Sequence, residues 1–562
     1  MEEIVLKGIL KQIEQEHVQD KKELNKLKIA YAREHNLKGL PTDAELSNAA
    51  DPDQRDRLKS ILAIKPVRTM AGVAPVALMT KPHKCPHGTC IYCPGGPDSP
   101  FGDVPQAYTG TEPATRRAIR NHYDPYYQVM NRLEHYVVMN QVPDKVEIIV
   151  MGGTFLSLHE SYKDKFIKLV YKAMNDFSDL FYKDDVLDVQ TFNDFFEMST
   201  SRDDPLREGK IHARQEVHRD QESTLEGEQL RNENSKIRCV ALVIETGAEA
   251  CDVDDLLKYG CTRVELGVQS VYGEIVKSVN RGHSAQDSID KTKELKDAGF
   301  KVTYHMMPGL PEPDLKLISY EKDLAGLKEI FTNPDWCPDM IKLYPCMVMK
   351  GTSLYKDYEK GLFTPLSTKD AAQMIVDFTP FIPDYCRIMR IQRDIPTYMT
   401  ESGVDRTNLR QYVDQLREQQ GITCRCIRCR EIGRKPAEGE VTYRTMSYDA
   451  SDGKEFFISA EINESIVGFS RVRFPADPTR KEIGSNDALL RELHVYGTAT
   501  AIGAEGNVQH KGVGKHLMEM AESIAKEHQK SKLIVISGVG VKQYYINKLG
   551  YHKEGPYVVK EL

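Results

Sequence analysis

The chain has 562 residues, a formal net charge of -7 at pH 7 and 40% hydrophobic residues. One hydrophobic core rarely serves so long a chain, so its length predicts two or three domains. The acidic balance excludes a uniformly basic nucleic-acid binder and leaves such contacts to local patches. Charged residues follow Met1, and no apolar run is long enough for a signal peptide or a membrane span. We therefore expect a cytoplasmic protein without membrane contact.

Residues 1–65 are polar, with a lysine-rich helical pattern over 21–28 and a helix start signal at 41–45. By spacing alone, this pattern is typical of a solvated amphipathic helix. It predicts a helical N-terminal region.

Three cysteines lie within nine residues, as Cys85-Pro-His-Gly-Thr-Cys90-Ile-Tyr-Cys93. A closed electron-transfer cluster takes four thiolates, so three cysteines leave one iron open to a substrate or cofactor. The following Pro-Gly-Gly-Pro segment suits a turn-rich loop around a cluster. The motif indicates an iron-sulfur site, with a zinc site or three unliganded thiols as alternatives.

From residue 66 onward, short apolar runs alternate with segments of helical length. This alternation predicts a parallel sheet covered by helices. Six such units fit an incomplete (β/α)6 barrel better than a dinucleotide fold, because no G-x-G-x-x-G follows the first strand. The cysteine loop comes directly after the first strand, at the expected C-terminal mouth. A charged insertion at about 175–235 is assigned local helices and no chemistry. The expected strands are 74–79, 146–151, 239–244, 263–269, 301–307 and 340–344.

A second cysteine group, Cys424, Cys426 and Cys429, has the pattern C-x-C-x2-C. This spacing favours a zinc site over three free thiols. A structural zinc takes four ligands, and a histidine or Cys386 is a candidate for the fourth by residue type alone. We therefore expect a zinc-binding linker over residues 361–436.

The last 125 or so residues, from 437, form a separate α/β pattern of one-domain size. Strands are expected at 456–462, 465–473, 491–496 and 533–537, with a helix near 512–528. The segment Gln509-His-Lys-Gly-Val-Gly-Lys515 lies between a strand and this helix, where backbone amides can approach a pyrophosphate. Glycine pairs also form ordinary turns, but the order of strand, glycine loop and Tyr544-Tyr545 is that of GNAT acetyltransferases.

Taken together, these motifs resemble the family of Elongator catalytic subunits in its archaeal or bacterial form. The resemblance implies four regions: 1–65 contacting tRNA, a radical S-adenosylmethionine (SAM) domain at 66–360, the zinc linker at 361–436 and a GNAT domain at 437–562. The motifs that carry it are CPHGTCIYCPGGPDS (85–99), AYTGTEPATRRAIR (107–120), DKVEIIVMGGTF (144–155), GCTRVELGVQSVY (260–272), NRGH (280–283), AGFKVTYHMMPGLP (298–311), RIQRDIP (390–396), RELHVYG (491–497), QHKGVGKHLMEMAE (509–522) and ISGVGVKQYYINKLGY (536–551).

For the radical domain, the resemblance implies that Cys85, Cys90 and Cys93 hold a [4Fe-4S] cluster whose open iron binds SAM. Gly152, Gly153 and Thr154 would lie against the methionine part of SAM, and Lys145 would reach acetyl-CoA. By spacing alone, the glycine pair is a plain strand-to-helix turn and Lys145 a solvated residue before a strand.

For the acetyltransferase domain, the resemblance implies sites for the pantetheine arm, the pyrophosphate and the thioester of acetyl-CoA. Tyrosines beside a thioester can protonate a leaving thiolate, although paired aromatic residues are more often packing. The implied residues are Glu492, Leu493, His494 and Val495 for the arm, Gln509, Gly512, Val513, Gly514 and Lys515 for the pyrophosphate, and Tyr544 and Tyr545 for catalysis at the thioester.

The implied substrate is the wobble uridine 34 of the tRNA anticodon loop. A 5'-deoxyadenosyl radical would take hydrogen from the acetyl methyl group, the carbon radical would add to C5 of uridine, and thioester hydrolysis would leave 5-carboxymethyluridine. A homodimer or additional Elongator-type subunits are compatible with this reaction. Basic residues interleaved with tyrosines can bind phosphates and stack bases, although without the resemblance they read as a solvated helix face. The basic residues are Arg116, Arg117, Arg120 and Arg132.

Two other readings remain at this stage. One is a protein lysine acetyltransferase with a structural iron-sulfur cluster. The other is a tRNA-binding scaffold with a decayed radical domain, suggested by IETGAE at 244–249, where many relatives read IETRPD. Gly247 thus replaces an arginine that could serve the SAM carboxylate. The intact cysteine triad and phosphate loop argue against decay.

Overall fold

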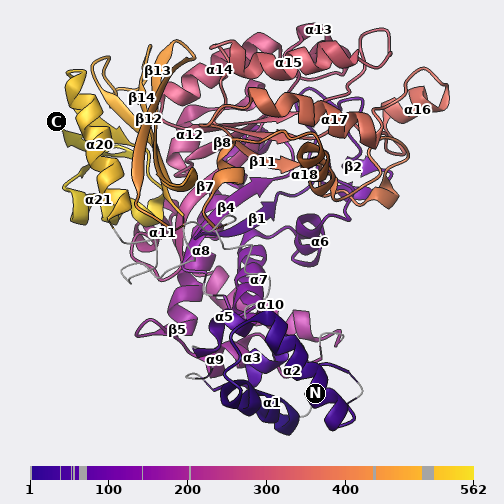
Figure 1. The fold of residues 1–562 in the computed structure, drawn as a ribbon, viewed down its shortest axis with the longest axis vertical. Helices are drawn as coiled ribbons and strands as arrows, with labels where there is room; N and C mark the ends of the chain where they lie inside the picture. Colours follow the sequence, from indigo (N-terminus) through magenta and orange to yellow (C-terminus); the bar gives the residue numbers. More distant parts are fainter. Residues whose placement is uncertain are drawn as a thin grey trace.

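Two seven-stranded sheets lie side by side, and a small group of helices lies at the opposite end of the molecule (Figure 1). The chain ends in the second sheet, and the N-terminus lies among the small helices. The computed structural model describes all residues except 1–2, 38, 52, 53, 55, 56, 63–71, 142, 202, 203, 434–437 and 497–511.

The first sheet is entirely parallel and has the order β1-β4-β7-β8-β9-β10-β11. Its first six strands confirm the six expected ones. The seventh lies in the segment expected as linker, and two arginines interrupt its sequence Arg-Ile-Met-Arg-Ile, which therefore forms no continuous apolar run. The strands are β1 (Ala74–Met79), β4 (Lys145–Met151), β7 (Arg238–Thr246), β8 (Arg263–Gln269), β9 (Lys301–Met306), β10 (Met340–Leu343) and β11 (Arg387–Ile391).

Helices cover the outer face of this sheet (Figure 1). They pack against fully buried residues such as Val146, Ile148 and Val150 of β4. The helices of this region are α6 (Pro113–Arg120), α7 (Pro125–Val138), α8 (Glu160–Phe181), α12 (Val253–Lys258), α13 (Gly273–Ser278), α14 (Ala285–Asp297), α15 (Tyr320–Thr332), α16 (Ser353–Glu359), α17 (Thr368–Phe378), α18 (Leu409–Gln419) and α19 (Ile427–Arg430).

The inner face of the sheet is polar. Along β4, Lys145, Glu147, Ile149 and Met151 face an internal cavity, while the residues between them face the helices. Successive side chains of a strand point to opposite faces, so each strand contributes one residue in two to the lumen of the incomplete barrel. This alternation also explains why β11, which turns Arg387 and Met389 into the cavity, escaped the search for apolar runs.

The charged insertion has an apolar core of its own. Phe177 and Phe181 at the end of α8 contact Phe192 and Phe196, with ring centroids 5.4 to 6.3 Å apart. Most of its charged residues lie exposed or half-buried around this core, while Asp176, Glu228 and Glu233 are buried. The elements are β5 (Tyr182–Lys183), β6 (Val186–Leu187), α9 (Val189–Phe195), α10 (Arg207–Arg219) and α11 (Leu225–Asn232).

The N-terminal helices pack around their own buried cluster, which includes Ile9, Leu24 and Leu46. The Asp20 carboxylate caps the second helix, and Thr42 forms a capping box with the third, at the start signal found in residues 41–45. The region is therefore a small packed unit rather than a solvated helix. The helices are α1 (Glu3–Gln15), α2 (Lys21–Glu34), α3 (Asp43–Ala49) and α5 (Lys59–Leu62).

The second sheet has the order β12-β13-β14-β15-β16-β18-β17. β15 pairs with β16 only through Ala488–Leu490, so the strands separate before residues 492–495. The expected strands and the helix near 512–528 are present, and β12, β17, β18 and α21 are additional. The elements are β12 (Thr442–Ala450), β13 (Gly453–Ile462), β14 (Ser465–Phe474), β15 (Ala488–Val495), α20 (Val513–Glu527), β16 (Lys532–Val535), α21 (Lys542–Leu549), β17 (His552–Glu554) and β18 (Tyr557–Glu561).

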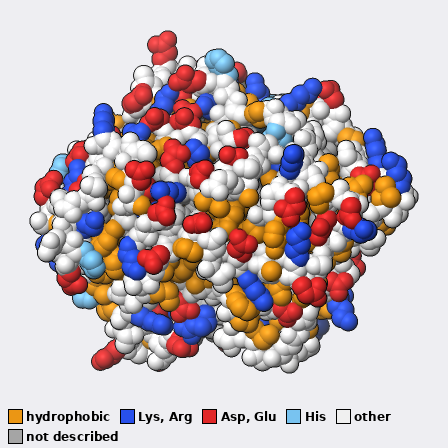
Figure 2. Space-filling view, turned by 90° about the horizontal axis from the view of Figure 1, so that it is seen from above, with side chains coloured by type: hydrophobic (Ala, Val, Ile, Leu, Met, Phe, Trp, Pro, Cys, Tyr) orange, Lys and Arg blue, Asp and Glu red, His pale blue; other side chains and the backbone are white. Residues whose placement is uncertain are grey.

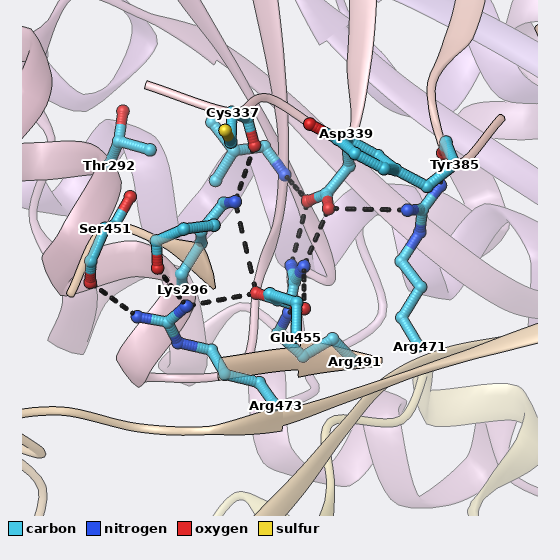
Figure 3. Close-up of polar contacts among 12 residues, drawn as sticks. Thr292, Lys296, Cys337, Asp339, Tyr385, Ser451, Glu455, Arg471, Arg473 and Arg491 are labelled. Atoms are coloured by element: carbon cyan, nitrogen blue, oxygen red, sulfur yellow. Dashed lines mark hydrogen bonds and ion pairs between the residues drawn. The ribbon is translucent and has the colours of Figure 1, made fainter. Parts of the chain in front are cut away.

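A buried ionic network joins the two sheets (Figure 3). The guanidinium of Arg491 on β15 bonds both carboxylate oxygens of Asp339, at 2.7 and 2.8 Å, and Glu455 at 2.9 Å. Asp339 precedes β10 and also accepts the backbone N–H of Val302. The second sheet is thus fixed to the N-terminal edge of the barrel strands. The buried charges of this region are Lys296, Arg471, Arg473, Arg491, Asp297, Asp339, Glu455 and Glu492.

Candidate active site

One cavity of about 910 Å³ runs through the lumen of the incomplete barrel. Cys85, Cys90 and Cys93 line it beyond the C-terminal ends of the strands. Residues 492–496 of the second sheet line it at the N-terminal ends. The cysteine loop and the strand expected to bind acetyl-CoA therefore line one and the same cavity.

The three cysteines lie on the loop after β1, each at most 8% exposed. The backbone N–H of Cys93 bonds the carbonyl of Cys90 at 2.9 Å, which fixes the tight turn. Their sulfur atoms do not all lie within 4.8 Å of one another. Three thiolates on one zinc ion, at about 2.3 Å each, would be roughly 3.8 Å apart. The separation argues against zinc and fits the wider span of an iron-sulfur cluster.

Polar groups surround these sulfur atoms. The amide of Gln106 donates to Cys93 Sγ at 3.4 Å, His87 Nε2 lies 3.5 Å from Cys90 Sγ, and the Thr154 hydroxyl lies 3.7 Å from Cys85 Sγ. Hydrogen bonds to thiolate sulfur are a usual feature around iron-sulfur clusters. The donor set therefore fits a [4Fe-4S] cluster.

The glycine pair after β4 lies directly under the cysteine loop. Gly152 and Gly153 have φ of 125° and 105°. A Cβ on Gly152 would lie 2.3 Å from Thr80 Oγ1, and a Cβ on Gly153 would lie 3.1 Å from Gln106 Cβ. Larger residues would be strained and would displace the residues that support the loop. The pair is more closely integrated with the cysteine site than a plain turn.

The segment that departs from IETRPD is built into the same site. The Glu249 carboxylate bonds His283 Nδ1 at 2.8 Å and His87 Nδ1 at 3.1 Å. A Cβ on Gly247 would lie 2.1 Å from Glu249 Oε2, so Gly247 leaves room for this arrangement. The Arg281 guanidinium lines the cavity, and its Nε donates to the Gly267 carbonyl at 3.1 Å. An arginine is therefore present beside the cysteine loop despite Gly247.

Sequence reasoning missed a charged cluster in the middle of the lumen. Glu265 accepts from His305 Nε2 at 2.9 Å and from Lys342, and Lys342 lies 3.7 Å from Glu245. Burial would raise the pKa of Glu265, but Lys342 and His305 hold it well below its ordinary value. The signal was an ionisable residue in the interior of each of these strands: Glu in RVELGVQ, His in KVTYHM and Lys in MIKL.

The predicted acetyl-CoA strand faces the barrel. Glu492 bonds Arg471 Nε at 2.8 Å, and its other oxygen lies 3.9 Å from Lys301 Nζ of β9. The His494 ring stacks against Phe469, and burial lowers the pKa of His494 to about 4. Leu493 and Val495 also line the cavity. Burial lowers the pKa of Lys145, which lines the cavity at the start of β4.

The start of α20 forms the other half of this site. Gly512 has φ of 83° and precedes Val513, while Gly514 and Lys515 line the cavity in the first helical turn. A Cβ on Gly514 would lie 3.7 Å from the Tyr544 hydroxyl. Tyr545 is buried beside Tyr544, with ring centroids 5.4 Å apart, and burial raises its pKa. Gln509 lies outside the described residues.

Cys424, Cys426 and Cys429 come together in the structure, with all three sulfur atoms within 4.8 Å of one another. This separation suits one zinc ion. Within the part of the chain that the structure describes, no fourth histidine, cysteine or carboxylate joins this group, so Cys386 is not supported as a ligand. The Arg417 guanidinium lies 3.7 Å from Cys429 Sγ.

The four arginines predicted to contact tRNA divide into two pairs. Arg116 and Arg120 are exposed on α6. Arg117 is 8% exposed and donates to the carbonyl of Ala77, and Arg132 is 8% exposed with its guanidinium 4.2 Å from the Tyr136 ring centroid. The prediction of a tRNA contact is not supported for Arg117 and Arg132, because both lie on the buried faces of their helices.

The chain matches four family models in sequence order. They are the ELP3 N-terminal domain (residues 2–70), the Radical SAM superfamily (79–319), the Radical_SAM C-terminal domain (338–419) and the Acetyltransferase (GNAT) family (427–551). The tRNA uridine(34) acetyltransferase of Methanocaldococcus infernus is 42% identical over 99% of this chain and 98% of its own length. The chain belongs to the Elongator complex protein 3 family.

More distant members of this family also match over the full length. The human Elongator complex protein 3 is 37% identical over 100% of this chain and 97% of its own length. The solved structure of archaeal M. infernus Elp3 with an N-terminal deletion is 37% identical, covers 88% of this chain and 100% of its own, and superposes with a TM-score of 0.70. These matches confirm the radical SAM and GNAT architecture. Among the described helices, none is long and apolar enough to cross a membrane.

Proposed function

We propose that this protein modifies the wobble uridine of tRNA, using acetyl-CoA and a SAM-derived radical to form 5-carboxymethyluridine at position 34. The observation that carries the proposal is the single cavity lined by both the cysteine triad and residues 492–496. A reaction that joins an acetyl methyl carbon to a base needs both cofactors in one space. The relatives named tRNA uridine(34) acetyltransferase support the choice of substrate.

The cavity has the charge that anionic substrates require. Ten lysines and arginines line it, against seven aspartates and glutamates, although the whole chain carries a net charge of -7. Acidic and basic side chains are interspersed over the face seen in Figure 2. The positive excess inside the molecule would attract tRNA phosphates and coenzyme A.

Cys85, Cys90 and Cys93 would hold a [4Fe-4S] cluster, which with SAM supplies hydrogen-atom abstraction from an unactivated methyl group. Arg281 would offer its guanidinium to the SAM carboxylate in place of the arginine missing at 247. Tyr545 would lie near the thioester with Tyr544 beside it, where a tyrosine hydroxyl can donate to the coenzyme A thiolate. Gly512 to Lys515 would bind the pyrophosphate at the start of α20.

We further assign one zinc ion to Cys424, Cys426 and Cys429, and contacts with the tRNA backbone to the N-terminal helices and to Arg116 and Arg120. A cytoplasmic location follows from the tRNA substrate. A homodimer and additional subunits are both compatible with this reaction.

The test uses the full-length protein with its cluster reconstituted without oxygen, given acetyl-CoA, SAM, a reductant and tRNA. Nucleoside mass spectrometry should detect 5-carboxymethyluridine at position 34. Cys90→Ser should abolish the product and the cluster absorbance, whereas Cys251→Ser, at a buried cysteine that does not line the cavity, should retain both. Hydrolysis of acetyl-CoA without modified uridine in a preparation that cleaves SAM would refute the proposal. Lysine acetylation of protein, independent of tRNA, would favour a protein acetyltransferase.

A further inference from the structure

The segment that contains the NRGH motif is bonded to the cysteine loop. The amide of Asn280 donates to the carbonyl of Thr89 at 2.9 Å and to the carbonyl of His87 at 3.5 Å. The backbone N–H of Ile91 donates to the carbonyl of Val279 at 3.2 Å. All three loop residues lie between the first and the last cysteine of the triad. The NRGH segment therefore fixes the backbone of the loop.

The same segment fixes the ring of His87, whose side chain is 9% exposed. Its Nδ1 bonds the Glu249 carboxylate at 3.1 Å, and its Nε2 lies 3.5 Å from Cys90 Sγ. His283 bonds the other oxygen of Glu249 at 2.8 Å. A Cβ on Gly282 would lie 2.5 Å from the Cβ, Cγ and Nδ1 of His87, so a larger residue there would displace the ring. The ring is therefore held in one orientation, with Nε2 directed at the sulfur atom.

A cluster ligand at Cys90 would place this ring between two anions. The Glu249 carboxylate lies at one ring nitrogen, and the Cys90 thiolate would lie at the other. An imidazole with an anion at each nitrogen carries both protons, and both nitrogens then donate. Hydrogen bonds to cluster sulfur help to set the reduction potential. They stabilise the reduced cluster more than the oxidised one, because the reduced cluster carries one more negative charge.

We infer that His87 donates a hydrogen bond to Cys90 Sγ and thereby raises the reduction potential of the cluster, with Glu249 and Gly282 as positioning residues. The hydroxyl and the amide beside the other two cysteines are neutral groups. Hydrogen bonds from charged donors are roughly twice as strong as those from neutral donors. Of these three contacts, the one to Cys90 should therefore have the largest effect. The inference deepens the proposed function and rests on it for the [4Fe-4S] cluster, but not for the tRNA reaction.

Two substitutions remove this contact in different ways. His87→Leu removes the donor, whereas Gly282→Ala keeps the donor and displaces its ring without a change of charge. His87→Gln places an amide N–H near the position of Nε2 and should restore part of the bond. Gly273→Ala is the matched control, because a Cβ on Gly273, at the start of α13, would have no atom of the described residues within 4 Å.

A redox titration followed by electron paramagnetic resonance measures the potential of the reconstituted cluster. It uses the full-length protein without SAM, acetyl-CoA or tRNA, and iron analysis shows how much cluster each variant holds. His87→Leu should lower the equilibrium constant for one-electron reduction about tenfold, which is a fall of about 59 mV in the potential. Gly282→Ala should shift the potential in the same direction, and His87→Gln should lower it less than His87→Leu. Gly273→Ala should leave it unchanged.

An unchanged potential in His87→Leu with the cluster retained would overturn the inference. If that variant holds no iron, an unchanged potential in Gly282→Ala overturns it instead. The measurement needs no turnover. A protein whose potentials follow this order but which makes no modified uridine would refute the proposed function and leave the role of His87 intact.

Discussion

Replacing Asp339 with asparagine would test the buried network that joins the two domains. The carboxylate is fully buried, bonds Arg491 at 2.7 and 2.8 Å and lies 3.6 Å from Arg471. The network balances four cations with four carboxylates, so the variant leaves one buried positive charge uncompensated. Breaking such a pair costs about 3–5 kcal/mol, a large share of the 5–15 kcal/mol that stabilises a typical domain.

Urea denaturation followed by tryptophan fluorescence would measure this loss. The chain has a single tryptophan, Trp336, which is 1% exposed and three residues from Asp339. Its emission therefore reports directly on the junction. Asp452→Asn is the matched control, because Asp452 is 64% exposed in its ion pair with Lys293, which also crosses the domain boundary. That exposed pair should contribute at most about 1 kcal/mol.

The pH dependence gives a second measure. Burial would raise the pKa of Asp339, but Arg491 and Lys296 hold it well below its ordinary value. The unfolded chain therefore takes up this proton first, below about pH 4, and the wild-type protein loses the contribution of Asp339 as the pH falls. The difference between wild type and Asp339→Asn should shrink below pH 4. Equal free energies of unfolding for the Asp339 and Asp452 variants at pH 7 would refute the reasoning.

Three further predictions concern the metal, the tRNA and the buried histidine. Cys426→Ser should lose the zinc that elemental analysis finds in the wild type, while Cys386→Ser should retain it; retention in the first variant would contradict the zinc site. Replacing Arg116 and Arg120 with alanine should weaken tRNA binding and lower the slope of log K against log salt by up to about two, and an unchanged slope would exclude these contacts. Burial lowers the pKa of His494 to about 4, so the free energy of unfolding should fall by at most about 3 kcal/mol between pH 6.5 and 4. Unfolding of His494→Gln should depend less on pH in this window, and an identical dependence would contradict the buried, neutral imidazole.

Much of the fold could be predicted because its signals are local. Runs rich in apolar residues, such as 146–151, predicted six barrel strands that the structure confirms, since strands covered by helices keep an apolar face. The cysteine spacings located both cysteine groups, because residues a few positions apart on a loop stay close in space. β11 was missed because Arg387 and Arg390, which line the polar lumen, interrupt its apolar residues, and the sequence does not reveal that lumen.

The tertiary structure decided which distant residues meet. Spacing placed Arg116, Arg117 and Arg120 on one helix, but only packing showed that Arg117 faces inward. Glu249 belongs to the segment 244–249, whose departure from IETRPD suggested a decayed radical domain. In the folded chain, however, Glu249 bonds His87 and His283, which come from two different segments.

By itself, the sequence determined that two cofactor domains lie in one chain, because each motif is a short stretch whose chemistry is complete within it. It did not determine that one lumen connects them. That feature depends on alternating residues from seven strands and on Asp339 meeting Arg491 across 152 positions. Contacts at such separation arise from the packing of whole sheets, and no local pattern encodes them.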